Sequence, residues 1–248
     1  MEIKIFKDAL ALGEASALAA VSSIKTILAV KGSANIILAT GASQFATLNF
    51  LVSEGDIDWS KVTMFHLDEY VGLPETHPAS FRKYLRDRFI SRVPSLKSYH
   101  LIDAETHPEQ ECERISKIIM EHPIDLALIG IGENGHIAFN DPPADFDTET
   151  PYIIVNLDEA CRNQQLGEGW FPSLEDVPTR AISMSVRQIL KSKEIICSVP
   201  DARKATAIKN TITQAVDNLY PSTILKTHPH CTVFLDTHSA SMLQATNQ

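Results

Sequence analysis

Residues 125–142, DLALIGIGENGHIAFNDP, constrain the fold more than any other stretch of the chain. Residues 126–131 are almost all large and apolar, and so short a run between turn residues is typical of a strand buried on both faces of a sheet. The glycines at its end, among them Gly132 and Gly135, let the backbone turn sharply and approach a ligand closely. Since a parallel sheet binds ligands just past the carboxyl ends of its strands, we expect His136 at an active site.

Strand-like apolar runs alternate with helix-forming segments along the whole chain. This alternation predicts an α/β fold, a Rossmann-like, mostly parallel sheet with helices on both faces. No repeat, low-complexity segment or linker interrupts it, so we expect residues 1–248 to form a single domain. Residues 161–178 are too rich in Gly, Pro and polar side chains for a prediction. The predicted strands are 3–6, 35–40, 62–67, 99–102, 125–131, 152–157, 181–186, 194–200 and 231–236, and the predicted helices are 9–30, 45–55, 78–93, 108–122 and 204–216.

The charge and composition exclude several classes of partner. The formal charge is −9, from 22 basic and 31 acidic residues, and without a basic cluster we expect no nucleic-acid partner. The N-terminus lacks a cleavable apolar region and no apolar run reaches membrane-spanning length, so we expect a cytoplasmic protein with no membrane association. Four scattered cysteines indicate reduced thiols and no disulfide framework or zinc site. Whether the chain forms a homo-oligomer stays open.

The glycine-rich loop itself has three interpretations. Residues 130–135, GIGENG, match the dinucleotide pattern G-x-G-x-x-G, but Pro142 and the proline after it prevent the long helix that this motif must open. The loop could be a plain tight turn, and His136 could be a core histidine. Asn134 and Asp141 lie in the same loop, however, and a carboxylate there could orient the imidazole for proton transfer near neutral pH.

Two acidic residues, Asp68 and Glu69, directly follow the strand predicted at 62–67. Adjacent side chains of an extended segment point in opposite directions, so one can face a pocket while the other braces the loop. An ordinary acidic turn is the alternative. His66 beside them could suggest a metal site, but no second cluster with ligand spacing accompanies it, and we expect no metal.

Residues 40–43, TGAS, join a predicted strand to a predicted helix with small residues, hydroxyls and free backbone amides. This arrangement suits a phosphate group, although no lysine follows as in a P-loop. A plain turn with an N-capping serine is the alternative. Lys204, at the start of a late helix, could supply the missing cation, although by itself it would be interpreted as a solvated lysine.

The chain resembles the glucosamine-6-phosphate deaminase (isomerase) family over nearly its whole length. The resemblance implies a Rossmann-like fold and the conversion of an amino sugar 6-phosphate to a ketose phosphate and ammonia, with no redox cofactor and no metal. The segments that carry it are LATGAS (38–43), FHLDEYVGLP (65–74), SFRKYL (80–85), GIGENGHIAFNDP (130–142), AISMSV (181–186) and RKATAI (203–208), of which DEYVGLP and GENGHIAFN are the most specific.

The same resemblance implies roles for individual residues. Asp68 is expected to be the base that moves a proton between C1 and C2, His136 to open the sugar ring, and Asn134 and Asp141 to support His136. A helix with Ser80, Phe81 and Tyr84 matches a mobile lid that would exclude water. The expected substrate-binding residues are Thr40, Gly41, Ala42, Ser43, Gly135 and Lys204.

The chain also departs from the family pattern. A glycine and a proline of the phosphate loop are replaced by Ala42 and Gln44, and Asp141 is one methylene shorter than the usual glutamate. Residues 143–155 lack the segment linked to activation by N-acetyl sugar phosphates, so we expect no such activation. Residues 162–171, RNQQLGEGWF, replace the usual arginine-bearing segment and leave only Arg162 as a substitute. The related 6-phosphogluconolactonases and a non-catalytic sugar-phosphate sensor are the alternatives.

Overall fold

A seven-stranded parallel sheet forms the centre of the structure, a computed structural model that describes residues 1–53 and 56–243. The strand order is β1-β10-β9-β6-β2-β3-β5, and every neighbouring pair is parallel. The mostly parallel α/β fold predicted from the sequence is therefore confirmed. The strands are β1 (Glu2–Phe6), β2 (Ala34–Leu38), β3 (Val62–His66), β5 (Ser98–His100), β6 (Leu126–Ile129), β9 (Glu194–Val199) and β10 (Cys231–Asp236).

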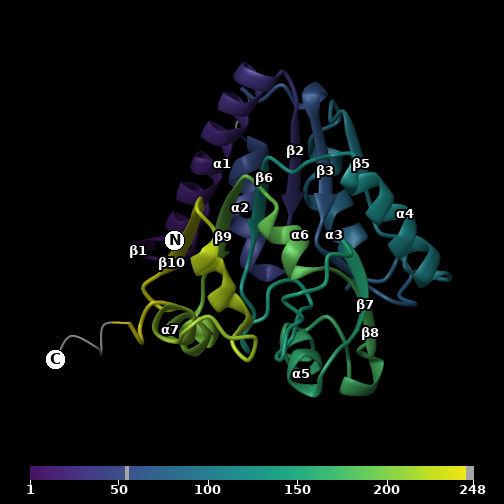
Figure 1. Cartoon of the computed structure of the whole chain (residues 1–248), viewed down its shortest axis with the longest axis vertical. Coiled ribbons are helices and arrows are strands. Elements are labelled where there is room, and N and C mark those ends of the chain that lie inside the picture. The colour runs from purple at the N-terminus through teal and green to yellow at the C-terminus, as the bar shows by residue number, and fades with distance from the viewer. Residues whose placement is uncertain (54–55, 244–248) are drawn as a thin grey trace.

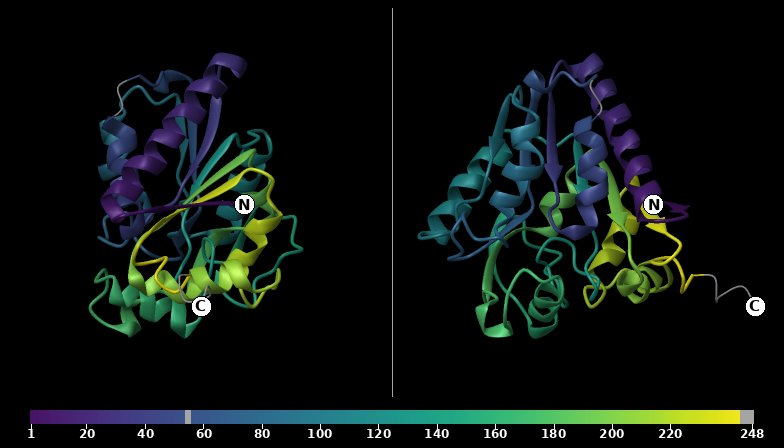
Figure 2. Two further views of the ribbon diagram at one scale, coloured as in Figure 1. Left: turned by 90° about the vertical axis from the view of Figure 1, so that its left-hand side faces the viewer. Right: turned by 180° about the vertical axis from the view of Figure 1, so that it is seen from behind.

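Helices cover both faces of this sheet, and β6 shows why. Leu126 and Leu128 pack into the apolar cluster beneath α1, α2 and α3, while Ala127 and Ile129 point the other way, toward α4, α6 and α7. All four residues are buried, as expected of a central strand. Figure 2 shows the two helical layers on either side of the sheet. The helices are α1 (Ala9–Lys31), α2 (Phe45–Ser53), α3 (Phe81–Arg88), α4 (Pro108–Met120), α6 (Val186–Leu190) and α7 (Ala205–Thr213).

A second, three-stranded antiparallel sheet lies beyond the carboxyl end of the main one. It has the order β4-β8-β7, from β4 (Asp68–Tyr70), β8 (Arg180–Met184) and β7 (Tyr152–Asn156). Only Leu67 separates β3 from β4, so the chain leaves the main sheet within one residue. In Figure 1, β7, β8 and α5 (Glu159–Gly167) lie together below the main sheet. Alternation of strands and helices could not predict this pairing.

The element boundaries differ from the sequence prediction in a few places. The unpredicted segment 161–178 contains most of α5, which begins where the Asp158 side chain accepts a hydrogen bond from Cys161 N at 2.6 Å. Helix α3 ends at Arg88, five residues before its predicted end. The predicted end of α2 at Gly55 lies outside the described residues.

The expectation that no segment reaches membrane-spanning length is wrong for α1. By length and composition this helix could cross a bilayer. In the fold, however, its buried residues, such as Leu12 and Ile24, pack with α2 against the sheet. The predicted absence of membrane association stays a prediction.

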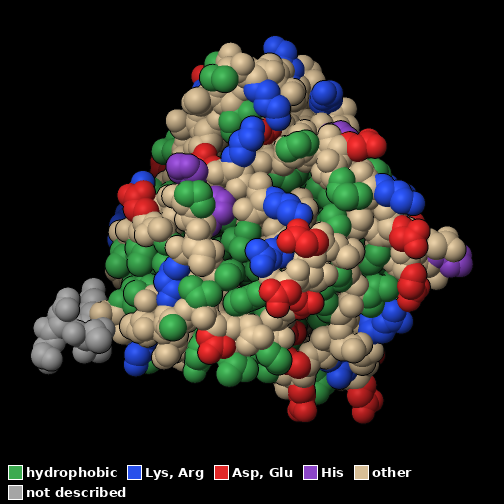
Figure 3. Space-filling model, in the orientation of Figure 1, with side chains coloured by type: hydrophobic (Ala, Val, Ile, Leu, Met, Phe, Trp, Pro, Cys, Tyr) green, Lys and Arg blue, Asp and Glu red, His purple; other side chains and the backbone are tan. Residues whose placement is uncertain are grey.

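Among the described residues of the face shown in Figure 3, Lys and Arg side chains are interspersed with Asp and Glu.

Candidate active site

One cleft at the carboxyl end of the main sheet collects side chains from four adjacent strands, in the order β9, β6, β2, β3. The chain winds from β2 outward to β3 and β5, and later from β6 outward to β9 and β10. The cleft therefore spans the switch point between β2 and β6, where open α/β sheets bind ligands. Six of the predicted residues line it: Thr40, Gly41, Ser43, Asp68, His136 and Lys204.

His136 is fixed at the β6 side of the cleft by the residues around it. Its Nδ1 lies 3.0 Å from Asp141 Oδ1, and its backbone N–H donates to Asn134 Oδ1 at 3.0 Å. Asn134 Nδ2 in turn donates to Asp141 Oδ1 at 2.9 Å. The three polar residues predicted in this loop are therefore in contact, and His136 lines the cleft.

Gly132 makes room for that imidazole. A side-chain carbon on Gly132 would lie 2.3 Å from both Cε1 and Nε2 of His136, closer than any carbon can approach. Gly135, in contrast, lies outside the cleft wall: its backbone has φ of 89° and its carbonyl accepts from Ser222 N. Glycine is needed at 132 for space and at 135 for backbone conformation.

The Asp141 carboxylate is held ready to stabilise a protonated imidazole. Burial alone would raise its pKa, but the hydrogen bond and charge of His136, with the Asn134 amide and the Cys161 thiol, bring the pKa below the ordinary 3.8. An ionised carboxylate behind Nδ1 orients the ring. The shorter aspartate therefore still reaches the histidine.

His136, Asp141 and Cys161 also place three groups of metal-ligating chemistry within 4.8 Å of one another. Asp141 already accepts a hydrogen bond from Asn134 and lies against His136 Nδ1. These contacts explain why the three side chains lie close together without an ion. The metal site weighed at His66 does not assemble, because Nε2 of His66 accepts from Ile102 N at 2.9 Å. The expected absence of a metal and of a cofactor stays a prediction.

Asp68, the first residue of β4, lines the cleft on the β3 side. The side chain is buried, and burial first, then the charge of Glu69, raises its pKa well above that of an ordinary aspartate. A buried carboxylate of this kind is a stronger base than one in water once it is ionised. Asp68 and Glu69 point to different surroundings, as alternation along an extended segment requires.

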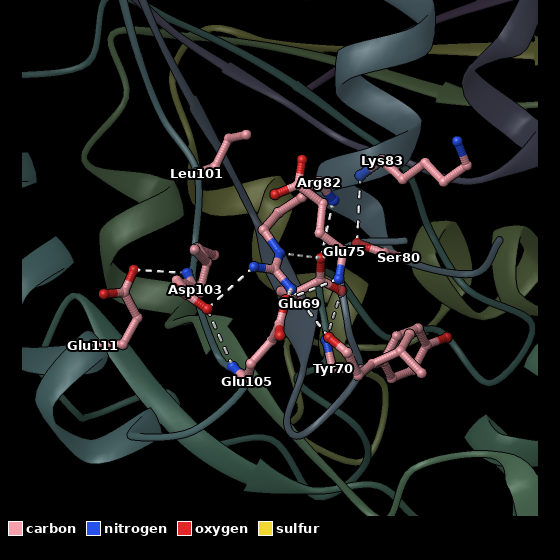
Figure 4. Close-up of polar contacts among 12 residues, drawn as sticks. Glu69, Tyr70, Glu75, Ser80, Arg82, Lys83, Leu101, Asp103, Glu105 and Glu111 are labelled. Atoms are coloured by element: carbon pink, nitrogen blue, oxygen red, sulfur yellow. Dashed lines mark hydrogen bonds and ion pairs between the residues drawn. The ribbon is translucent and has the colours of Figure 1, made fainter. Parts of the chain in front are cut away.

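Glu69 ties the start of α3 to β4. Its two oxygens accept five hydrogen bonds: from Tyr70 N, Phe81 N and Arg82 N, from the Ser80 hydroxyl, and from Arg82 Nε. Figure 4 shows these bonds converging on Glu69, with the Arg82 guanidinium reaching on to the Asp103 and Glu105 carboxylates. The helix expected to be a lid therefore has its N-terminus bound to the residue next to Asp68.

The loop between β2 and α2 forms the third wall. Gly41, with φ of 94°, turns the chain into the short helical turn Ala42–Gln44, so that free amides precede α2. The side-chain Nε2 of Gln44 donates to the Ser198 carbonyl at 3.2 Å, and the hydroxyl of Tyr84 in α3 donates to the Gly41 carbonyl at 3.0 Å. Such helix starts attract anions. Ala42 itself lines the adjoining pocket and not the cleft.

Lys204, which follows β9, lines the cleft and brings a positive charge to it. Its side chain is 6% exposed, and burial lowers its pKa from the ordinary value. Its Nζ lies 3.7 Å from Glu133 Oε1. The lysine is therefore a buried residue of the cleft wall. It is not the solvated side chain that its sequence position alone suggested.

Three lining residues escaped the sequence analysis, namely Gln164, Gln165 and Glu168 of the unpredicted segment. Gln165 Oε1 accepts from the Tyr70 hydroxyl at 2.7 Å, which fastens α5 to β4. The sequence signal that could have found them is the run of polar residues beside two glycines in segment 162–171, RNQQLGEGWF. The substitute proposed from the sequence, Arg162, is wrong, because its guanidinium donates to the carbonyls of Leu174 and Val177 and holds that loop.

Comparison with known proteins matches the site's fold and sequence to one family. The profile described as glucosamine-6-phosphate isomerases/6-phosphogluconolactonase covers residues 7–234. The chain belongs to this family. Glucosamine-6-phosphate deaminase of Streptococcus pneumoniae is 37% identical over 213 residues, 86% of this chain and 88% of the relative. The deaminase of Listeria monocytogenes is 39% identical over 206 residues, 83% and 86% of the two chains.

Solved structures of the family agree. A structure described as a monomeric glucosamine-6-phosphate deaminase superposes with a TM-score of 0.88 at 29% identity, covering 98% of this chain and all of that one. The 6-phosphogluconolactonase of Trypanosoma brucei gives 0.81 at 16% identity, with 98% of each chain covered, and shows the shared fold alone. The family acts on sugar phosphates, which is consistent with an anion site beside acid/base residues.

Proposed function

We propose that the protein converts glucosamine 6-phosphate and water to fructose 6-phosphate and ammonia. The observation that carries this proposal is that Asp68 and His136, two side chains able to transfer protons, line the same cleft as Lys204 and residues of the TGAS loop. Curated relatives at 37–39% identity are named for this activity. We further propose that residues 1–248 act as one domain in the cytoplasm, without nucleic-acid or membrane partners.

The chemistry needs a proton at two places. The His136 imidazolium, stabilised by the Asp141 carboxylate, donates its Nε2 proton to the ring oxygen, and the imidazole left behind accepts the proton of the anomeric hydroxyl, which opens the pyranose. Asp68 then removes the C2 proton of the open chain while the His136 imidazolium protonates the aldehyde oxygen at C1, and Asp68 returns its proton to C1, leaving a protonated imine at C2. Water hydrolyses the imine to the ketone and releases ammonia. Asn134 holds Asp141 in line throughout.

This proposal makes Asp68→Asn the decisive substitution. An amide cannot accept the C2 proton, so we expect kcat to fall by at least about 100-fold, the usual size of a general-base contribution. Binding of a non-reacting substrate analogue should stay within a few fold. Ammonia release is the assay, and unchanged turnover would remove Asp68 from the mechanism.

The pH profile tests the same assignment. Because burial raises the pKa of Asp68, its base form appears only above the ordinary range near 3.8. We expect the acid limb of kcat/KM to lie at a higher pH than that of a solvated aspartate. A protein that releases no ammonia from any hexosamine 6-phosphate but hydrolyses 6-phosphogluconolactone would favour the lactonase alternative, and binding without turnover would favour the sensor.

A further inference from the structure

Glu168 places a carboxylate where the proposed phosphate group must bind. Its side chain lines the cleft together with Ser43 and Lys204, and it also lines the adjoining pocket that these two residues share. A side-chain carbon on Gly41 would lie 3.9 Å from Glu168 Oε2. The carboxylate therefore stands beside the anion-binding loop and lines the same cleft as Lys204.

Carboxylates surround Lys204 and its neighbour Arg203. Glu133 lies 3.7 Å from Lys204 Nζ and 3.6 Å from Arg203 Nη1, and Asp201 pairs with Arg203 Nη2 at 2.9 Å. With Glu168, three carboxylates accompany these two cations. A dianion that binds beside the 40–43 loop is attracted by the charge of Lys204 but repelled at short range by the charge of Glu168.

Helix stability does not explain Glu168. The residue is the C-cap of α5, where the helix dipole disfavours a negative charge. Its Oε1 accepts from Gln164 Nε2 at 3.2 Å, a bond between half-buried side chains. Carbons added at the flanking Gly167 and Gly169 would meet nothing within 4 Å, so this turn carries Glu168 without packing against the core. A neutral glutamine would serve the helix better.

We propose that Glu168 is a specificity-determining residue that weakens binding of the phosphate group, so that only ligands that also engage the Asp68 and His136 side chains bind at low concentration. This inference rests on the proposed function for the nature of the ligand. It makes free inorganic phosphate and sugar phosphates without the amino group poor competitors for the site.

The test is Glu168→Gln, which keeps the shape and an acceptor for Gln164 but removes the charge. Titration calorimetry with inorganic phosphate should show about tenfold tighter binding than in the wild type, or about 1.4 kcal/mol, the size expected from a carboxylate close to a dianion in a solvated cleft. The KM for glucosamine 6-phosphate should fall, and inhibition by inorganic phosphate should strengthen. Glu175→Gln, an exposed residue outside both pockets, is the matched control and should change neither.

Phosphate binding that is unchanged or weaker in Glu168→Gln overturns the inference, as does the absence of measurable phosphate binding in both proteins. A raised KM would instead mean that Glu168 binds the substrate's hydroxyl groups, and would overturn it too. The phosphate titration needs no turnover, so it decides the inference even if the wild-type protein releases no ammonia and the proposed function fails.

Discussion

Replacing Glu69 by glutamine should strongly destabilise the protein, because Glu69 and Arg82 form a buried ion pair. Their side chains are 0% and 4% exposed, and the carboxylate accepts five hydrogen bonds, three from backbone N–H groups. An amide turns one acceptor oxygen into a donor that faces these donors, and it leaves Arg82 without its buried partner. Breaking a buried pair in this way typically costs about 3–5 kcal/mol of unfolding free energy.

Denaturant unfolding of Glu69→Gln measures that loss, and its Tm should drop by roughly 10 °C for a chain of this size. The control is Asp103→Asn, which removes another carboxylate from the same guanidinium, 3.1 Å away but 69% exposed. An exposed pair contributes less than about 1 kcal/mol, so the control should unfold almost as the wild type does. Equal losses in the two variants would refute the argument that burial of Glu69 sets the magnitude.

Two further predictions concern the histidine loop. Gly132→Ala places a methyl against the His136 ring and should lower kcat by at least about tenfold through displacement of the general acid, whereas Gly167→Ala, with nothing within 4 Å, should leave ammonia release unchanged. Folding lowers the pKa of Asp141, so its stabilisation is present above the ordinary value of 3.8 and is lost as pH falls through the folded-state pKa. Urea unfolding at a series of pH values should therefore show the stability advantage of the wild type over Asp141→Asn shrink as the pH falls below 3.8; an advantage that stays constant with pH contradicts this.

Local pattern was sufficient to predict the strand and loop at 125–142 and the position of Asp68. A short apolar run is a strand wherever it packs, and glycines after it must form a turn whichever partners surround them. The loop at 40–43 was equally local, since small residues at a strand-to-helix junction leave amides free. These predictions depended on the pattern of apolar residues along the chain and on backbone sterics, both of which neighbouring residues in the sequence determine.

The tertiary structure alone decided which of these pieces meet. The order β9-β6-β2-β3 cannot be read from the chain, and it is this order that places the 40–43 loop between His136 and Asp68, with Lys204 on the far side. The role of segment 162–171 was equally hidden, because polar residues beside glycines predict no element. Packing of α5 turned Arg162 to the loop carbonyls and Glu168 toward the proposed anion site, a choice made by contacts between residues far apart in the sequence.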